Sequence, residues 1–317
     1  MSAPPSPPIT VAAFYKFARL DGLEQLRDRL HQFCTEQEIV GTILLAAEGI
    51  NATVAGPDIS IQRLLDHLNR DQRLADIKVK RSLASEVPFH RLKVKVKAEI
   101  VTMGVTGLDP AQNTGVHVDA QKWNQLLQDP DVITIDTRND YEYHIGTFQS
   151  AISPETKNFR EFPQFVEQNL DPQQHRKIAM FCTGGIRCEK ASAYLLDQGF
   201  EEVYQLDGGI LNYLEQQPEG ESLWQGECFV FDGRVAVNHD LEAGSHIMCY
   251  GCRRPLSAGD CASDRYEAGV SCPHCYDDLT EEQTASFRER WRQEVMAQQR
   301  QQKHVGGVMP RSSDSPQ

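Results

Sequence analysis

Apolar and polar residues alternate along the first hundred residues in two rhythms, a period of two that is typical of strands and a period near 3.6 that is typical of helices. Residues 23–37 carry the helical spacing, and residues 92–97 alternate strictly. The expected strands and helices, in the order βαββαββ, span residues 11–20, 23–37, 41–47, 50–56, 60–71, 77–82 and 90–102. Ser60 is the expected N-cap of the second helix. This order predicts a ferredoxin-like α+β domain over residues 10–106.

The strict alternation places three lysines, Lys93, Lys95 and Lys97, on one face of a strand. They belong to a basic stretch, residues 78–97, which holds seven Lys or Arg and one Glu in a chain whose formal net charge is −13. That net charge argues against a protein that coats nucleic acid unselectively. The local excess leaves two interpretations open: a solvated face that discourages edge pairing, or a surface that binds nucleic-acid phosphates.

A segment rich in Gly, Pro and Asn, residues 107–115, predicts a linker. Strand and helix patterns alternate after it, with strands expected at residues 132–138, 177–183 and 203–210 and helices at 119–127 and 192–200. Such alternation predicts a parallel α/β domain over residues 116–217, with its active loops at the carboxyl ends of the strands.

The chain changes character again near Trp224. Residues 228–237 predict a hairpin and two close cysteine pairs follow, so we expect a small cysteine-rich module over residues 224–279. Residues 280–317 begin as a charged helix and end in a tail too polar to build a core, which predicts disorder there.

Composition narrows the class of protein. The 317 residues suffice for two or three domains, and no apolar run is long enough to cross a bilayer. The proline-rich start lacks the features of a signal peptide, so we expect a cytoplasmic protein with no membrane partner. Thiols stay reduced in that compartment, so the nine cysteines indicate metal ligands or reactive thiols rather than disulfides.

Residues 181–188, FCTGGIRC, join a predicted strand to a predicted helix. Gly184 and Gly185 allow a tight loop, and a helix N-terminus offers convergent N–H groups and the positive end of the helix dipole. Together with the charge of Arg187, these features would lower the pKa of Cys182 and bind an anionic group at its sulfur. Four residues separate the cysteine from the arginine, one fewer than in a Cys-x5-Arg phosphatase loop, and the smaller ring suits sulfur better than phosphate.

Other interpretations of this loop stay open. Cys182 could be a packing residue on a glycine turn, because free cysteines are common in protein cores. Cys188 could resolve an oxidised Cys182 as a disulfide, or merely pack in the first turn of the helix.

Two CxxC pairs in the third segment are separated by 19 residues, and their members are Cys249, Cys252, Cys272 and Cys275. This spacing predicts a tetrahedral structural zinc site. A CPHC sequence alone is also typical of thiol–disulfide oxidoreductases, but these need a thioredoxin-type fold that so short a segment cannot form. The sequence contains no G-x-G-x-x-G run, so no organic cofactor is expected.

The stretches IDTRNDYEYHIGTFQSAI, CTGGIRCEKASAYL and VYQLDGGILNYL resemble the strand end, active loop and late Gly-Gly turn of rhodanese domains. Rhodanese-like domains carry a persulfide on the loop cysteine. The implied roles are the reactive Cys182 with Arg187 as its anion stabiliser and Cys188 beside it, a substrate loop of Thr183, Gly184, Gly185 and Ile186, and supporting residues Asp136, Arg138 and Glu142. One departure is Gly146-Thr147-Phe148, where many rhodaneses have Gly-His-Ile.

The order of the three segments resembles one bacterial family, the rhodanese-containing, oxygen-dependent tRNA uridine hydroxylases, over roughly residues 10–280. AAEGINATVAG and VPFHRLKVKVKAEIVTMG are similar to the N-terminal domain of that family. The resemblance implies conversion of the wobble uridine, position 34, of certain tRNAs to 5-hydroxyuridine, with molecular oxygen and a reductant. Cys182 would either add to C6 of the base or carry an activated oxygen or sulfur species.

On this hypothesis the basic stretch holds the phosphates of the tRNA anticodon arm, through Lys78, Lys80, Arg81, Arg91, Lys93, Lys95 and Lys97. Two alternatives remain. A thiosulfate or persulfide sulfurtransferase would explain the cysteine loop but not the basic domain, and a non-catalytic RNA-binding redox sensor would use Cys182 and Cys188 as its switch. The sequence identifies neither the electron donor nor the oligomeric state.

Overall fold

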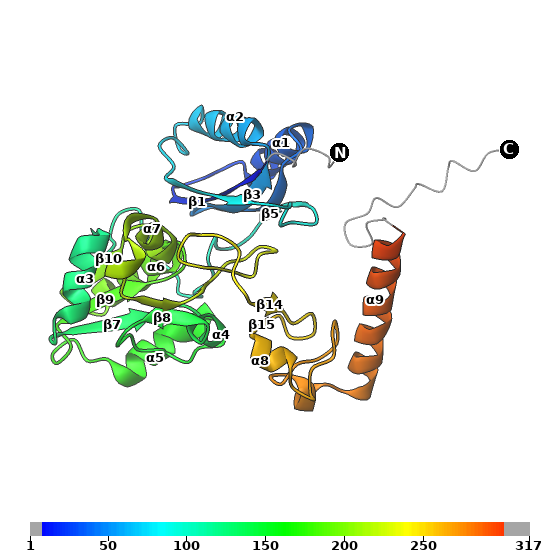
Figure 1. Cartoon of the computed structure of the whole chain (residues 1–317). Coiled ribbons are helices and arrows are strands. Elements are labelled where there is room, and N and C mark those ends of the chain that lie inside the picture. Colours follow the sequence, from blue (N-terminus) through cyan, green and yellow to red (C-terminus); the bar gives the residue numbers. More distant parts are fainter. Residues whose placement is uncertain (1–7, 301–317) are drawn as a thin grey trace. The chain divides into compact units, whose positions relative to one another are not determined.

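The structure is a computed structural model that describes residues 8–300 (Figure 1). The chain divides into two compact units, of which the first ends at Gly244 and the second begins at Ser245.

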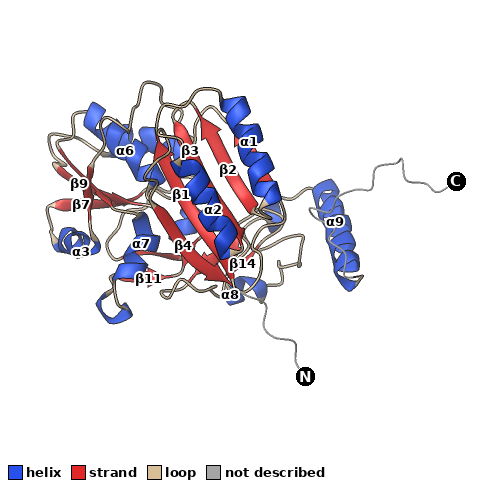
Figure 2. Ribbon diagram, turned by 90° about the horizontal axis from the view of Figure 1, so that it is seen from above, coloured by secondary structure: helices blue, strands red, loops and turns tan. Residues whose placement is uncertain are grey.

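The N-terminal part of the first unit is a five-stranded sheet with two helices on one face (Figure 2). Its elements are β1 (Ile9–Phe17), α1 (Leu23–Glu36), β2 (Val40–Ala46), β3 (Gly49–Gly56), α2 (Asp58–Asn69), β4 (Val79–Ala84) and β5 (Leu92–Val96). The strand order is β4-β1-β3-β2-β5, antiparallel except for the parallel pair β2 and β5. This topology confirms the ferredoxin-like domain, extended by one strand beside β2.

Two local predictions in this domain were wrong. The helix α2 begins at Asp58 after Pro57, so Ser60 is a buried residue of its first turn and not the N-cap. A proline is well tolerated there because its fixed φ suits a helix start and the missing N–H has no intrahelical acceptor. The last strand ends at Val96 instead of continuing to residue 102, because side chains hold the backbone beyond it: Glu48 accepts a hydrogen bond from the backbone N–H of Ile100 over 2.7 Å.

The face of this sheet opposite the helices, here called the helix-free face, is set by the strand register. Ala12 and Phe14 of β1 pack in the core with α1 and α2, so Ala13 and Tyr15 point to the other side. Directly paired residues share a face, and two rows therefore cross it: Lys80–Ala13–Thr53–Thr42–Lys93 and Tyr15–Asn51–Leu44–Lys95.

The second part of the first unit is a parallel α/β domain. Its sheet has the order β6-β10-β9-β7, with all pairs parallel. The elements are β6 (Val116–Val118), α3 (Ala120–Gln128), β7 (Val132–Asp136), α4 (Asp140–Tyr143), β8 (Gly146–Phe148), α5 (Phe162–Asn169), β9 (Lys177–Phe181), α6 (Ile186–Asp197), β10 (Glu202–Leu206) and α7 (Gly209–Gln216). The sequence pattern missed β6, which has three residues, too few to show a period.

The central strand β9 is buried on both faces. Ile178 and Met180 belong to one hydrophobic cluster, whereas Ala179 and Phe181 belong to another. An unbroken apolar run of this kind is typical of a parallel sheet covered on both sides, and the predicted α/β architecture is confirmed.

Residues 224–244 belong to this first unit and not to the cysteine-rich module. The strand β11 (Trp224–Gly226) pairs with β8, and Trp224 packs on Phe148 with ring centroids 5.1 Å apart. The expected hairpin is present as β12 (Cys228–Phe229) and β13 (Ala236–Val237). The cysteine-rich unit therefore begins at Ser245 instead of at Trp224, because this large aromatic side chain is buried among those of the α/β domain.

The second unit holds β14 (Ile247–Met248), β15 (Pro255–Leu256), α8 (Ala258–Cys261) and the charged helix α9 (Glu281–Gln299), expected from the sequence. Its buried apolar cluster centres on Leu256 and cysteines, which is little for a unit of this size. The tail for which disorder was expected lies, from residue 301 on, outside the described residues. No helix within residues 8–300 is both long enough and apolar enough for a bilayer crossing.

Candidate active site

Cys182 lies in the connection between β9 and α6, at the carboxyl edge of the parallel sheet. Gly185 has a φ of +99°, in the left-handed region that favours glycine. Its backbone N–H donates to Cys182 Sγ over 3.1 Å. A Cβ on Gly185 would lie 2.8 Å from the hydroxyl of Tyr15. Both the turn and the side chain that packs on it therefore require a glycine at this position.

The two cysteines of the loop have opposite pKa shifts. Burial raises the pKa of Cys182, but the Cys188 thiol, the charge of Arg187 and the backbone N–H groups of the first helical turn outweigh burial. The pKa of Cys182 therefore lies well below its usual value. Burial and the neighbouring Cys182 raise the pKa of Cys188. In this geometry ionisation is favoured at Cys182 over Cys188.

Arg187, the expected anion stabiliser, is already paired. Its two terminal nitrogens donate to the carboxylate of Glu142 over 2.6 and 2.8 Å. Glu142 is fully buried, and burial raises its pKa. The charge and hydrogen bonds of Arg187, the charge of Arg138 and the backbone N–H of Asn139 together outweigh burial and lower that pKa. The guanidinium still acts on Cys182 through its charge, but the N–H groups that face Glu142 are not available to a substrate.

Asp136 and Arg138 form a second buried ion pair, with an Nη2–Oδ2 distance of 2.6 Å. The same Arg138 nitrogen donates to the backbone carbonyl of Gly146 in β8 over 2.6 Å. Its guanidinium also lies 5.2 Å from the ring centroid of Trp224. This pair therefore ties the end of β7 to β8 and β11, which is a structural role.

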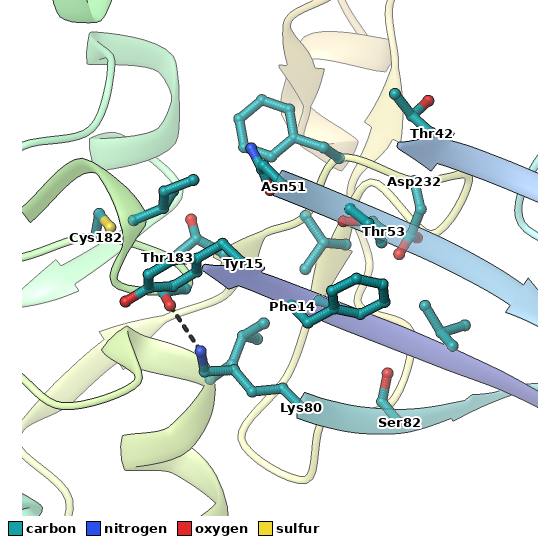
Figure 3. Close-up of a pocket in the computed structure, with 18 of the residues that line it drawn as sticks. Phe14, Tyr15, Thr42, Asn51, Thr53, Lys80, Ser82, Cys182, Thr183 and Asp232 are labelled. Carbon is teal, nitrogen blue, oxygen red and sulfur yellow. Dashed lines mark hydrogen bonds between the residues drawn. The ribbon is translucent and has the colours of Figure 1, made fainter. Parts of the chain in front are cut away.

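Two side chains of the N-terminal sheet reach the loop, as Figure 3 shows. Lys80 Nζ donates to the backbone carbonyl of Gly184 over 2.7 Å. The hydroxyl of Tyr15 donates to Glu189 Oε1 in α6 over 2.9 Å. Sequence reasoning missed Tyr15, which no motif marks, and expected Lys80 to contact phosphates.

The helix after the loop is held to the N-terminal sheet by two charged residues. Glu189 also lies 3.0 Å from His117 Nε2. Lys190 is only 2% exposed and pairs with Glu48 over 2.8 Å and with Glu99 over 2.6 Å. A signal was present in the sequence, because this helix carries two adjacent charged residues, and charged side chains need partners when they are buried.

A cavity of about 430 Å³ lies between the loop and the helix-free face, and residues 230–241 form a further part of its wall. Cys182 and Thr183 line it from the loop, and Tyr15, Asn51 and Thr53 line it from the sheet (Figure 3). A volume of this size lies within the range of small-molecule sites. The lining also includes Gly184, Ile186 and Arg187 of the expected substrate loop.

The structure separates the predicted phosphate-binding residues into two groups. Lys78 and Arg81 pair with Asp207 and Asp58 over 3.1 and 3.3 Å, and Lys80 contacts the loop. The rest lie in or beside the edge strand β5 and are Arg91, Lys93, Lys95 and Lys97. Lys93 and Lys95 are on the helix-free face, in register with the cavity residues Thr42 and Leu44.

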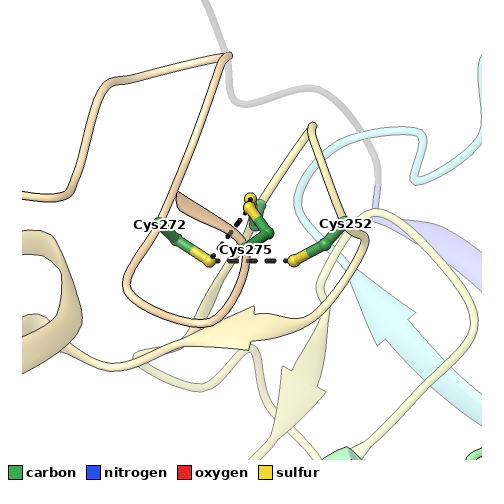
Figure 4. A group of neighbouring side chains, drawn as sticks. Cys252, Cys272 and Cys275 are labelled. Atoms are coloured by element: carbon green, nitrogen blue, oxygen red, sulfur yellow. Dashed lines mark hydrogen bonds between the residues drawn. The ribbon is translucent and has the colours of Figure 1, made fainter. Parts of the chain in front are cut away.

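In the second unit, the four cysteines of the CxxC pairs come together, and Figure 4 labels three of them, Cys252, Cys272 and Cys275. All four sulfurs lie within 4.8 Å of one another, and three of the separations are 4.0, 3.7 and 3.7 Å. Sulfurs bound tetrahedrally at zinc–sulfur distances of about 2.3 Å would be about 3.8 Å apart. This geometry therefore fits a metal ion such as zinc, which could be held by the thiols of Cys249, Cys252, Cys272 and Cys275.

The two parts of the first unit each match a known domain family. Residues 9–100 match the UPF0176 acylphosphatase-like domain, and residues 119–216 match the rhodanese-like domain. Among solved structures, the chain is similar to a rhodanese-like domain from Anabaena sp., with 20% identity, a TM-score of 0.29 and coverage of 35% of this chain and 78% of that one. It is also similar to acylphosphatase from Bacillus subtilis, with 15% identity, a TM-score of 0.24 and coverage of 27% and 98%.

One relative matches almost the whole chain. The tRNA uridine(34) hydroxylase of Teredinibacter turnerae is 56% identical over 296 residues, which are 93% of this chain and 92% of that protein. A match of this length includes most of both domains and of the cysteine-rich unit. The chain therefore belongs to the tRNA uridine(34) hydroxylase family.

Proposed function

We propose that this protein is a cytoplasmic enzyme that hydroxylates C5 of uridine 34 in tRNA, through Cys182, with molecular oxygen and a reductant. The observation that carries the proposal is the cavity: a cysteine with a lowered pKa faces, across about 430 Å³, the sheet of a second domain. The relative named for uridine 34 supports the substrate. A base in an anticodon loop leaves its stack at low cost, so it can enter such a cavity.

The lowered pKa of Cys182 supports a nucleophilic role. The thiolate forms an S–C6 bond, and the displaced π electrons make C5 nucleophilic. One atom of O₂ then becomes the C5 hydroxyl, and the other leaves as water with two electrons and two protons from the reductant. Loss of the C5 proton and departure of the sulfur with its electron pair restore the C5–C6 double bond and the thiolate.

The proposed tRNA contacts are those of the edge strand, Arg91, Lys93, Lys95 and Lys97. Lys93 and Lys95 share the helix-free face with the cavity lining, so phosphates bound there would bring the anticodon loop to the entrance. Lys78 and Arg81 already pair with carboxylates of the protein, and we assign them no phosphate.

The triple variant Lys93→Glu/Lys95→Glu/Lys97→Glu should bind tRNA more weakly, with a flatter dependence of log Kd on log salt. Each lost phosphate contact should reduce the slope by about 1. Filter binding at several salt concentrations measures both quantities. Lys122→Glu, an exposed residue of α3 outside the basic stretch, is the control with unchanged binding. Wild-type affinity in the triple variant would remove these lysines from the tRNA site.

For the second unit we propose a structural zinc ion held by Cys249, Cys252, Cys272 and Cys275. The sulfur separations support it, and so does the small apolar core, since metal binding stabilises units that bury little apolar surface. Metal analysis of the purified protein decides between zinc and free thiols.

The test of the function is nucleoside mass spectrometry of tRNA from a strain that lacks the gene. We expect 5-hydroxyuridine and its derivatives to disappear and to return with the wild-type gene. Unchanged tRNA, together with loss of thiosulfate:cyanide sulfurtransferase activity, would instead favour the sulfurtransferase alternative.

A further inference from the structure

One cation in the wall of the cavity differs from the others in its partners. The cationic residues that line it are Lys80, Arg81, Arg187 and Arg234. All three arginines pair with a carboxylate, at 3.3 Å for Asp58, 2.6 Å for Glu142 and 2.7 Å for Asp232. Among residues 8–300, Lys80 has no carboxylate within ion-pair distance, and its ammonium donates a hydrogen bond to the carbonyl of Gly184.

Lys80 is placed to act on a molecule that also meets Cys182. It begins the row Lys80–Ala13–Thr53–Thr42–Lys93 of the helix-free face, and its amino group points to the loop (Figure 3). The carbonyl it contacts is two residues from Cys182. An ammonium has three N–H donors, so two remain for a ligand in the cavity.

The surroundings of Lys80 strengthen its electrostatic effect. Burial lowers its pKa from the usual value of a lysine, and the ring of Tyr15 lies 5.5 Å from its nitrogen. A cation that is partly removed from water and not neutralised by a carboxylate interacts more strongly with a negative charge than a solvated one does.

We propose that Lys80 is a further catalytic residue, whose ammonium donates a hydrogen bond to O4 of the uracil and stabilises the negative charge that forms there. The inference rests on the proposed function. When the sulfur lone pair forms the S–C6 bond, the C5–C6 π pair becomes a C4–C5 double bond and the C4–O4 π pair moves onto O4. No proton is transferred in this step. When the C4–C5 π pair forms the bond from C5 to oxygen, the pair on O4 moves back to the C4–O4 bond and regenerates the carbonyl.

This role also predicts discrimination against cytosine. Cytosine has an amino group in place of O4, so two donors would face each other at Lys80. A site built to donate a hydrogen bond rejects a ligand that lacks the acceptor, because its buried donor is then left unpaired. Arg187 cannot take this role with the nitrogens that face Glu142.

The experiment compares Lys80→Met with the wild type on a tRNA anticodon stem-loop with U34, under air, with extract of the deletion strain as the source of reductant. We expect kcat to fall by about 10²- to 10³-fold, as for loss of one oxyanion donor, while Kd for the stem-loop stays within about twofold. Lys80→Arg should recover part of the rate. Lys122→Met, exposed on α3, should behave as wild type.

A stem-loop with 4-thiouridine at position 34 tests the atom involved. Sulfur accepts hydrogen bonds less well than oxygen, so we expect the wild type to prefer uridine and Lys80→Met to lose that preference. If Lys80 only supported the loop, Lys80→Met would change the rate at which iodoacetamide alkylates Cys182. We expect that rate to stay within about threefold of wild type, because Lys80 acts on the base.

Each outcome decides between roles. A tenfold weaker Kd of Lys80→Met with unchanged kcat would indicate that Lys80 contacts a phosphate. A large loss of Cys182 alkylation would indicate that Lys80 only supports the loop. Either result overturns the inference. Full activity of Lys80→Met beside an active wild type refutes this inference alone. If the wild type makes no 5-hydroxyuridine, the proposed function fails and the inference fails with it.

Discussion

Cys182→Ser should abolish the formation of 5-hydroxyuridine, with the rate reduced by at least about 10³-fold. The loop lowers the pKa of a thiol by hydrogen bonds and by the charge of Arg187, but the same groups cannot ionise a serine hydroxyl near neutral pH. Complementation of the deletion strain with each variant, followed by nucleoside mass spectrometry, measures the effect. A Cys182→Ser variant with wild-type product levels would exclude nucleophilic or carrier chemistry at this sulfur.

Cys188→Ser is the matched control, because it removes the other sulfur of the same loop. Cys188 has a raised pKa and stays protonated, and a serine hydroxyl can still donate to Cys182. We therefore expect this variant to keep its activity within about tenfold. A loss as complete as that of Cys182→Ser would indicate instead that a disulfide between the two cysteines is part of the reaction or of a redox switch.

The lowered pKa of Cys182 also predicts how the reactivity of this thiol depends on pH. A thiol with a depressed pKa remains ionised as the pH falls below about 8.5, where an ordinary cysteine becomes protonated. The alkylation of Cys182 by iodoacetamide, followed by peptide mass spectrometry, should therefore stay nearly constant between about pH 8 and about pH 6.5. A tenfold decrease per pH unit over that range would contradict the lowered pKa.

The second large effect concerns stability. Glu142→Gln should lower the free energy of unfolding of the first unit by about 3–5 kcal/mol, because it leaves the buried guanidinium of Arg187 without a counter-charge. Glu142 is 0% and Arg187 7% exposed, so water cannot replace the lost carboxylate. Urea unfolding followed by circular dichroism measures the change.

The control for this variant is Asp129→Asn, which breaks the ion pair with Lys177. Both side chains of that pair are 32% exposed, so the loss should be at most about 1 kcal/mol. In the folded part of the Glu142→Gln population, the uncompensated Arg187 should lower the pKa of Cys182 further. If Glu142→Gln lowered the free energy of unfolding as little as the control does, the buried Glu142–Arg187 pair would not be needed for stability.

Most elements of the fold could be predicted from the sequence because each depends on neighbouring residues. The apolar runs at β7, β9 and β10 and the helical spacing of α1 and α3 are local patterns that burial on one or both faces requires. Two of the failures were local too. The three-residue strand β6 has no readable period, and the proline before α2 started that helix two residues before Ser60.

The candidate site could be predicted only in part. The spacing of Cys182 and Arg187 identified the loop, because the features that form it lie within a few residues of one another: a strand end, two glycines and the start of a helix. The partner of Arg187 lies 45 residues away at Glu142, and Glu142 was expected only as a supporting residue. Tyr15 lies in no recognisable sequence motif, because its contact is with Glu189, 174 residues further along the chain.

The sequence by itself determined the fold classes of the two domains, the position of the cysteine loop and the CxxC pairs, because periodicity and spacing follow from short-range backbone geometry. The domain families were indicated by the resemblance of its motifs. Only the tertiary structure decided the environment of that cysteine: an arginine neutralised by Glu142, and a lysine of another domain that reaches the loop with no carboxylate partner among the described residues. Strand register and domain packing bring together Lys80 and Gly184, which are 104 residues apart. No local pattern records such a pairing, because it depends on how two separately folded sheets face each other.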